Sequence, residues 1–372
     1  MSVTIRHPHA EEFDALMRFL ELGFGHSKGF FERTLGHVCR PDPEALLWSY
    51  VIEEEGQIVS HVGVYPIEVI TLGIRLQIGG IGQVCTHPQA RGKGYMSMLL
   101  RHSIDEMRAL GYSLSWLGGD RQRYNSLGWE QAAPGYTLTW SRRSLDRHLI
   151  KPGTVEEQYP QDALAHVQRF QFEQPCSAIR PWLERQLRRP GLRAWTADDG
   201  YALAEAGERD CLPIIELVST SGHEVEMIRA LIERAAVDSA EWTLSAWDAR
   251  LPRLMPAVAR YRSEGWWMYR IIDLYRLLQA ALPHLERRAQ AVRNLNIGIA
   301  VHEHDRTDAV IITVENGAIE IQRGVGVPTV VHLDPLEAVR LFIGGPPIGV
   351  PVPPALAALL PVPVHVSPLD YL

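Results

Sequence analysis

One stretch of this sequence suits the binding of an anionic ligand. Residues 84–96, VCTHPQARGKGYM, join an apolar run to a basic turn that contains Gly92 and Gly94. Where a helix follows such a turn, its first N–H groups lack partners, and with the helix dipole they bind phosphate. Glycine lets the backbone approach a ligand, and Arg91 and Lys93 add positive charge. The stretch predicts a phosphate-binding strand–turn–helix, although a plain connection between strand and helix also fits it.

The elements that would position this turn follow from the spacing of apolar residues. Residues 92–110 carry apolar side chains at helical spacing, and Gly111 is a natural helix stop. Residues 47–87 contain strand-like runs separated by Glu55-Gly56-Gln57 and by Leu72-Gly73, which predicts an antiparallel meander of three strands. We also expect a helix at 11–24, a strand at 112–117, a short helix at 120–126 and a last strand at 136–140.

Two further units are expected beyond residue 150. The second contains predicted helices at 163–172 and 224–236 and a predicted strand at 213–219. The third contains predicted strands at 298–301, 309–314, 318–322 and 329–333, a helix at 335–343, and a Pro-rich tail from 346 that we expect to be extended. The pattern places the protein in the α+β (mixed α/β) class.

The composition argues against several classes of protein. A formal charge of −7 argues against a nucleic-acid-binding surface, which usually has a basic excess. The first residues do not resemble a secretory signal, and no apolar stretch is long enough to span a bilayer. We therefore expect a cytoplasmic protein that binds neither nucleic acid nor membrane.

No metal site is expected. The four cysteines lie far apart and form no CxxC pair, so they predict neither a zinc site nor a disulfide framework. The segment His302-Glu303-His304-Asp305 has residues that can bind metal, but it lies between two predicted strands. Since alternate strand residues point to opposite faces, we interpret it as a hairpin turn.

The turn at 84–96 and a second motif together resemble the GNAT superfamily of N-acetyltransferases. In that family R-x-x-G-x-G/A binds the pyrophosphate of acetyl-CoA, and here the motif falls on Arg91, Gly94 and Met96, where Met96 departs from the usual Gly or Ala. The resemblance implies that acetyl-CoA is the cosubstrate. It implies that the cofactor-binding residues are Val84, Cys85, Thr86, Arg91, Gly92, Lys93, Gly94, Tyr95, Met96 and Asn125.

The second motif, RYNSLGWE at 123–130, is similar to the family's Y-x-x-x-G-F-E segment. The resemblance implies that Tyr124 is the general acid, because a phenol is protonated at neutral pH and can protonate a departing thiolate. Alternatively, the Tyr124 ring only packs in the core. His87 is a candidate base or a solvated strand-end residue. Trp116 and Trp129 are expected to be packing residues that could also line an acceptor pocket.

The rest of the chain resembles the enhanced-intracellular-survival (Eis-like) acetyltransferases. Residues 265–278, GWWMYRIIDLYRLL, are similar to their M-x-R-[IV]-[IV]-D junction, and residues 296–345 look like their sterol-carrier-protein-2-like domain. The expected organisation is a catalytic GNAT domain at 1–150, a second GNAT-like domain at 151–278 and a carrier-like domain at 279–372. The second domain is expected to be non-catalytic, because Ser219-Thr220-Ser221-Gly222 is too neutral to hold a pyrophosphate.

These observations predict an N-acetyltransferase that moves an acetyl group from acetyl-CoA to a primary amine by direct attack in a ternary complex. The resemblance implies that the carboxylate of Leu372 reaches the active site as base; otherwise the tail only completes the third domain. A non-catalytic acyl-CoA sensor and a lipid-binding module are the alternatives. The acceptor, a small molecule or a lysine side chain, stays open, and the family suggests a homo-oligomer.

Overall fold

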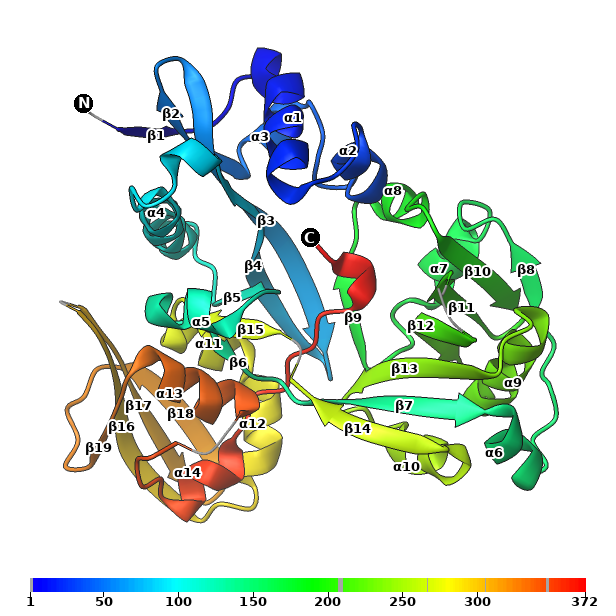
Figure 1. Cartoon of the computed structure of the whole chain (residues 1–372). Coiled ribbons are helices and arrows are strands. Elements are labelled where there is room, and N and C mark those ends of the chain that lie inside the picture. Colours follow the sequence, from blue (N-terminus) through cyan, green and yellow to red (C-terminus); the bar gives the residue numbers. More distant parts are fainter. Residues whose placement is uncertain (1–2, 207–209, 266, 305, 346–347) are drawn as a thin grey trace.

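The computed structural model describes residues 3–206, 210–265, 267–304, 306–345 and 348–372. Its strands form three sheets within these ranges, as Figure 1 shows. The first sheet has the order β1-β2-β3-β4-β5-β15-β6, and β9 pairs with the far end of β3. Its strands are β1 (Thr4–Arg6), β2 (Ser49–Glu54), β3 (Gln57–Thr71), β4 (Ile74–Thr86), β5 (Leu114–Leu117), β6 (Glu130–Gln131), β9 (Cys176–Ile179) and β15 (Met268–Ile271).

The predicted meander of three strands is confirmed. β2, β3 and β4 pair antiparallel, and the two connecting turns have positive φ values at Glu55, Gly56, Leu72 and Gly73. Glycine at the second position of each turn adopts this conformation without steric cost. The predicted helix at 11–24 is also present, as η1 (Ala10–Glu12) and α1 (Phe13–Phe24), followed by α2 (Phe30–Thr34) and α3 (Pro43–Leu46).

Helix α4 (Tyr95–Ala109) packs against the first sheet, after the short turn η2 (Pro88–Ala90). It begins after Gly94, with φ 81°, and Gly111, with φ 82°, follows its last residues as predicted. Leu99, Leu100 and Met107 of the predicted apolar stripe are buried in the core beneath the helix. The helix therefore lies where the sequence pattern places it, at the end of β4.

The second sheet contains a strand that the sequence assigned to the first unit. Its order is β14-β7-β13-β12-β11-β10-β8, made of β7 (Gly135–Ser141), β8 (Glu156–Gln158), β10 (Leu192–Ala197), β11 (Gly200–Glu205), β12 (Cys211–Ser219), β13 (Ser239–Ser245) and β14 (Arg260–Glu264). The predicted strand at 136–140 is confirmed as β7, but it pairs with β13 and β14 of the second sheet and not with a strand of the first. Conversely, β15 lies between β5 and β6 of the first sheet.

Burial explains this exchange of strands. Leu138 and Trp140 of β7 are completely buried in the core of the second sheet, and Met268 and Tyr269 of β15 are buried beneath the first. Strands are therefore exchanged in both directions across the expected limit between the first two domains at 150. Helices α6 (Arg142–Arg147), α7 (Leu164–Phe170), α8 (Leu183–Leu187), α9 (Glu224–Arg234), α10 (Leu251–Leu254) and η4 (Met255–Ala257) complete this part.

The third sheet has the order β18-β17-β16-β19. Its strands and helices are β16 (Asn294–Glu303), β17 (Arg306–Glu315), β18 (Ala318–Arg323), β19 (Val330–Leu333), α11 (Leu274–Ala280), α12 (Leu282–Ala289), α13 (Pro335–Val339), η5 (Arg340–Gly344), α14 (Pro354–Leu359) and η6 (Pro368–Asp370). The hairpin at 302–305 is confirmed by the pairing of Glu303 with Arg306, although Asp305 lies outside the described residues. The tail is not simply extended, since α14 and η6 interrupt it. Trp266, in the junction motif, is outside the described residues.

The C-terminal tail leaves the third unit and returns to the first sheet. In Figure 1 its last turn, η6, lies between the β3–β4 hairpin and the second unit. Val362, Val364 and Val366 are buried on the way, in a core shared with the ends of β3, β4 and β5. Within the described residues, no helix combines the length and the apolar character that crossing a membrane requires.

Candidate active site

The site is built where two parallel strands separate. β4 pairs with β5 only along Ile78–Gly80, so residues 81–86 of β4 have no neighbouring strand on that side. β4 also carries a bulge here: Gln83 has φ 46°, and the register with β3 shifts between His61 and Gly63. The ring nitrogen His61 Nδ1 lies 2.8 Å from the Gln83 carbonyl oxygen, and the Tyr65 hydroxyl donates to Gln83 Oε1. β3 therefore fixes the backbone of β4 beside an open edge.

A cavity of about 760 Å³ lies between this open edge and the first turn of α4. Eight of the ten residues predicted to bind the cofactor line it: Val84, Cys85, Thr86, Arg91, Gly92, Gly94, Tyr95 and Met96. The structure thus brings the predicted strand end, turn and helix start together. It adds Gly23, Phe24, Ala90, Ser97 and Arg123, which sequence reasoning missed.

The glycines of the turn are required by its backbone. Gly92 and Gly94 have φ values of 82° and 81°, in the left-handed region that other residues rarely adopt. A β-carbon at either position would meet no atom within 4 Å, so the space in front of the turn is open. The turn can therefore receive a ligand against its backbone at the N-terminus of a four-turn helix.

The charge at the cavity differs from the prediction. Lys93 does not line it, because its Nζ atom lies 2.8 Å from a Glu54 carboxylate oxygen, and the Tyr95 hydroxyl donates to the same carboxylate. The positive charge comes from Arg91 and Arg123, neither of which has an ion-pair partner in the described part of the chain. Arg123 stands directly before Tyr124 in the second motif, and that position is the sequence signal that could have identified it.

Tyr124 ends helix α5 (Arg121–Tyr124), just before η3 (Asn125–Leu127). Its ring is buried and packs edge-on against Trp129, with ring centroids 6.5 Å apart. Burial raises the pKa of Tyr124 above its usual value. Its hydroxyl has no hydrogen-bond partner among residues of the described ranges. Neither Tyr124 nor Asn125, which follows in η3, lines the cavity, whereas Arg123 directly before them does.

The other candidates from the sequence, Trp116, Trp129 and His87, make contacts within the protein. The Trp129 indole donates to Ser115 Oγ at 3.3 Å, and Trp116 is buried beside Trp267. His87 Nδ1 accepts from the Gln89 backbone N–H at 3.3 Å and caps the turn η2. These contacts favour packing roles for both tryptophans and a backbone-bonded role for His87.

Leu372 lies against Gly80 and Gly82 of β4, just before the bulge at Gln83. A β-carbon built on Gly80 would lie 2.1 Å from Leu372 Cδ1, and one built on Gly82 would lie 3.5 Å from the carboxyl carbon of Leu372. A side chain at Gly80 would displace the Leu372 side chain, and one at Gly82 would press on Tyr65 and on Leu372. The structure therefore places the last residue at the strand that also lines the cavity.

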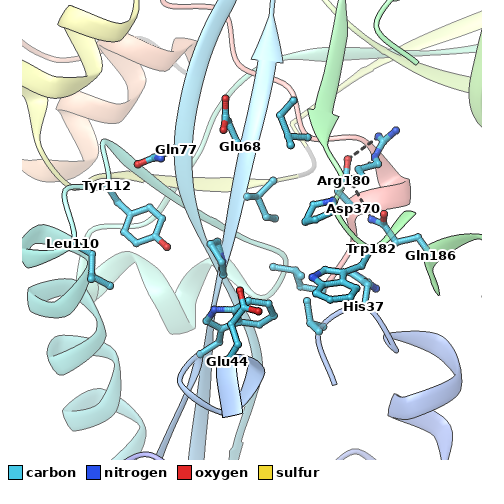
Figure 2. A pocket seen from close by; sticks show the side chains of 17 residues that line it. His37, Glu44, Glu68, Gln77, Leu110, Tyr112, Arg180, Trp182, Gln186 and Asp370 are labelled. Carbon is cyan, nitrogen blue, oxygen red and sulfur yellow. Dashed lines mark hydrogen bonds and ion pairs between the residues drawn. The ribbon is translucent and has the colours of Figure 1, made fainter. Parts of the chain in front are cut away.

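A second cavity of about 400 Å³ lies beside Leu372, and Figure 2 shows the side chains that line it. Its lining includes the carboxylates of Glu44, Glu68 and Asp370 and the aromatic residues Trp48, Tyr112 and Trp182. Glu68 is paired with Arg75, and Asp370 with Arg180, which also lines the cavity. The Glu44 carboxylate and the aromatic rings are therefore the groups that favour a cationic ligand. Of these residues, the sequence singles out only Asp370, which stands two residues before Leu372 and could help to draw in a cationic amine; the others come from separate elements and were not identified.

His37 also lines the second cavity. It is buried, and neither of its ring nitrogens has a hydrogen-bond partner within the ranges described. Burial lowers the pKa of His37 to about 4. The imidazole is therefore neutral near pH 7 and can exchange a hydrogen bond with a ligand.

Comparison with known proteins assigns the first part of the chain to a known kind of domain. Residues 4–132 match the model of the acetyltransferase (GNAT) domain family. The chain is similar to the uncharacterized N-acetyltransferase YhbS of Escherichia coli (strain K12), with 29% identity over 102 residues, or 27% of this chain. That match spans 60% of the length of YhbS. These findings support a GNAT acetyltransferase domain in the first part of the chain.

Solved structures resemble nearly the whole fold. A probable N-acyltransferase of unknown function from Enterococcus faecalis has a TM-score of 0.72 at 18% identity, covering 92% of this chain and 90% of its own. Eis1 from Mycobacterium abscessus has a TM-score of 0.61 at 18% identity, with the same coverage. At such identities the likeness concerns the fold alone, and it extends across all three sheets.

Proposed function

We propose that this protein is an N-acetyltransferase that transfers an acetyl group from acetyl-CoA to a primary amine, by direct attack in a ternary complex. The observation that carries the proposal is the cavity at the separation of β4 and β5, which ends at the Gly92/Gly94 turn and holds Arg91 and Arg123. An open strand edge can hydrogen-bond an extended amide chain, and a basic helix N-terminus can hold a pyrophosphate. The family match over residues 4–132 supports the same assignment.

In this proposal Val84, Cys85 and Thr86 hold the pantetheine arm through their backbone groups, and Tyr124 is the general acid. Attack by an amine on the thioester expels a thiolate, and a phenol at hydrogen-bond distance lowers the cost of that step. Burial favours the neutral form of Tyr124, which keeps the proton available at neutral pH.

The amine would enter through the second cavity, and the carboxyl group of Leu372 would receive it. Leu372 lines that cavity and contacts Gly82, one residue before the bulge of β4. An α-carboxylate is a weak base, so its main effect is to attract the ammonium group and to orient the amine. The acidic and aromatic lining supports an amine acceptor, of small-molecule or lysine type, over an anionic one.

The proposal includes a domain organisation like that of the Eis-like family. We propose a catalytic domain at 1–150, a non-catalytic GNAT-like domain at 151–278 and a carrier-like domain at 279–372, with strands exchanged between the first two. The shared fold with Eis1 supports an Eis-like arrangement, in which a homo-oligomer is expected. The four-stranded third sheet with helices on it supports the carrier-like domain.

A screen for release of the CoA thiol from acetyl-CoA, against a panel of polyamines, aminoglycosides, lysine peptides and arylamines, tests the proposed activity. We expect turnover with at least one amine, and none with neutral alcohols of the same size. If acetyl-CoA binds but no amine is acetylated, the protein is an acyl-CoA sensor and the proposal is wrong. With an active amine in hand, three residues appended after Leu372 should lower kcat/KM strongly, because they displace the carboxylate without changing a side chain.

A further inference from the structure

The second unit keeps the architecture of a cofactor-binding sheet. β12 pairs in parallel with β13 along residues 211–214, and its later residues have no strand partner on that side. It also has an irregular register with β11, between Leu203 and Ala204. The same two features, strand separation and a register shift, form the cavity at β4. The edge of β12 after residue 214 therefore corresponds to the open edge of β4.

The equivalent position in β12 carries a carboxylate. Gly82 is the second residue after the last parallel pair of β4, and Glu216 is the second residue after that of β12. Gly82 leaves room for the end of the chain, whereas the side chain of Glu216 fills the space and is 2% exposed.

The occupant is the C-terminal tail of the same chain. The turn η6 contacts β12, and Leu369 is buried in the apolar core of the second unit beside Phe170 and Ile215. The Ser367 hydroxyl donates to Glu216 Oε1 at 2.6 Å, and the Leu369 carbonyl oxygen accepts from Gln186 Nε2 at 3.3 Å. The tail thus packs against β12 beside Glu216.

A buried arginine joins the tail to this unit. Arg180 donates to both Asp370 carboxylate oxygens at 2.8 Å, and it donates to Glu216 at 2.5 and 3.2 Å (Figure 2 shows its contact with Asp370). Arg180 directly follows β9, the strand that pairs with β3 of the first sheet. It therefore lies at the point where the second unit meets the candidate active site.

Every carboxylate oxygen of this cluster has a donor. Besides the arginine, Tyr201 and Ser367 donate to Glu216, and Gln186 donates to Asp370 at 3.0 Å. A buried ionic network with all its groups paired is rigid and specifies one geometry. Only Tyr371 lies between Asp370 and Leu372, so fixing Asp370 also limits where Leu372 can lie.

We infer that the second unit serves as the dock that holds the C-terminal tail, so that Arg180 and Asp370 position Leu372 at Gly82. Only the use of Leu372 in catalysis depends on the proposed function. The docking itself depends on contacts that exist in the structure whether or not the carboxyl group acts on the amine.

The test compares Asp370→Asn with Asp198→Asn in the full chain. Asp370→Asn keeps the shape but removes a charge from the cluster, while Asp198 is an exposed turn residue of the same unit with no hydrogen bond or ion pair in the described ranges. We expect Asp370→Asn to lower kcat by about 10- to 100-fold, because small misplacements of reacting groups have effects of this size. The KM for acetyl-CoA and all properties of Asp198→Asn should stay near wild type.

Two readouts do not depend on catalysis. Hydrogen exchange of residues 367–372 should become faster in Asp370→Asn and not in Asp198→Asn, and calorimetry should give the same acetyl-CoA affinity for both variants. Unchanged exchange of the tail in Asp370→Asn would overturn the docking. If the tail loosens but kcat stays at the wild-type value, docking holds and the catalytic use of Leu372 fails. If an extension after Leu372 abolishes turnover while Asp370→Asn leaves both kcat and tail exchange unchanged, the proposed function stands and the dock is wrong.

Discussion

Replacement of Tyr124 by Phe should lower the turnover rate while leaving the stability of the fold nearly unchanged. The ring stays in place, packed against Trp129, and only the hydroxyl is lost. Because that hydroxyl forms no hydrogen bond within the described ranges, no internal donor or acceptor is left unpaired. We therefore expect the free energy of unfolding to change by no more than about 0.5 kcal/mol.

The expected effect on turnover is far larger. A general acid typically contributes about 10²- to 10⁴-fold, which corresponds to roughly 3 to 5 kcal/mol of transition-state stabilisation. Binding of acetyl-CoA should be nearly unchanged, because the cavity lining comes from β4, the Gly92/Gly94 turn and Arg123. The loss should therefore be in kcat and not in the dissociation constant of the cosubstrate.

The assay follows release of the CoA thiol at saturating amine, with calorimetry for acetyl-CoA binding and urea unfolding for stability. Tyr159→Phe, at an exposed tyrosine of the second unit, is the matched control and should behave like the wild type. Since burial raises the pKa of Tyr124, the wild-type rate should not fall through ionisation of this group between pH 7 and its usual pKa of about 10. A Tyr124→Phe enzyme with wild-type kcat refutes the assignment, whatever its stability.

Three further predictions concern the turn, the strand and the acid stability of the fold. Gly94→Trp should weaken acetyl-CoA binding measured by calorimetry, because its side chain would enter the open space before the turn; equal affinity in both proteins contradicts a pyrophosphate site there. Gly82→Ala should lower kcat, since its β-carbon would lie 3.2 Å from Leu372 Cβ, whereas Gly326→Ala, with nothing within 4 Å, should not; equal rates argue against a role for the tail. Burial would raise the pKa of Glu130, but hydrogen bonds from two arginines lower it to about 2, so its stabilisation is present above the unfolded pKa of about 4.3 and is lost as pH falls toward 2. Glu130→Gln should therefore be about 3 kcal/mol less stable than wild type in urea at pH 7, with the gap closing near pH 2; a gap independent of pH would show that the ion pairs are not its cause.

The sequence by itself determined the local parts of the candidate site. The turns at Gly56 and Gly73, the start of α4 after Gly94 and its end before Gly111 depend on backbone conformations that glycine adopts at little cost, so they can be predicted from a few neighbouring residues. The same local chemistry predicted that Arg91 and the strand end at Val84 and Thr86 would meet, and they line one cavity.

Only the tertiary structure decided where distant residues meet. The exchange of β7 and β15 between sheets, the contact of Lys93 with Glu54 and the acidic second cavity all join segments far apart in the chain. An apolar strand has the same periodicity whichever sheet buries it, and a lysine after a glycine can turn toward a phosphate or toward a carboxylate. Which sheet a strand joins, and which charge a lysine contacts, depends on the partner that completes a buried core or an ion pair. That partner is determined by packing over the whole chain. The buried cluster of Arg180, Glu216 and Asp370 is the clearest example, because its three charges can be buried together only where the folded tail reaches the second unit.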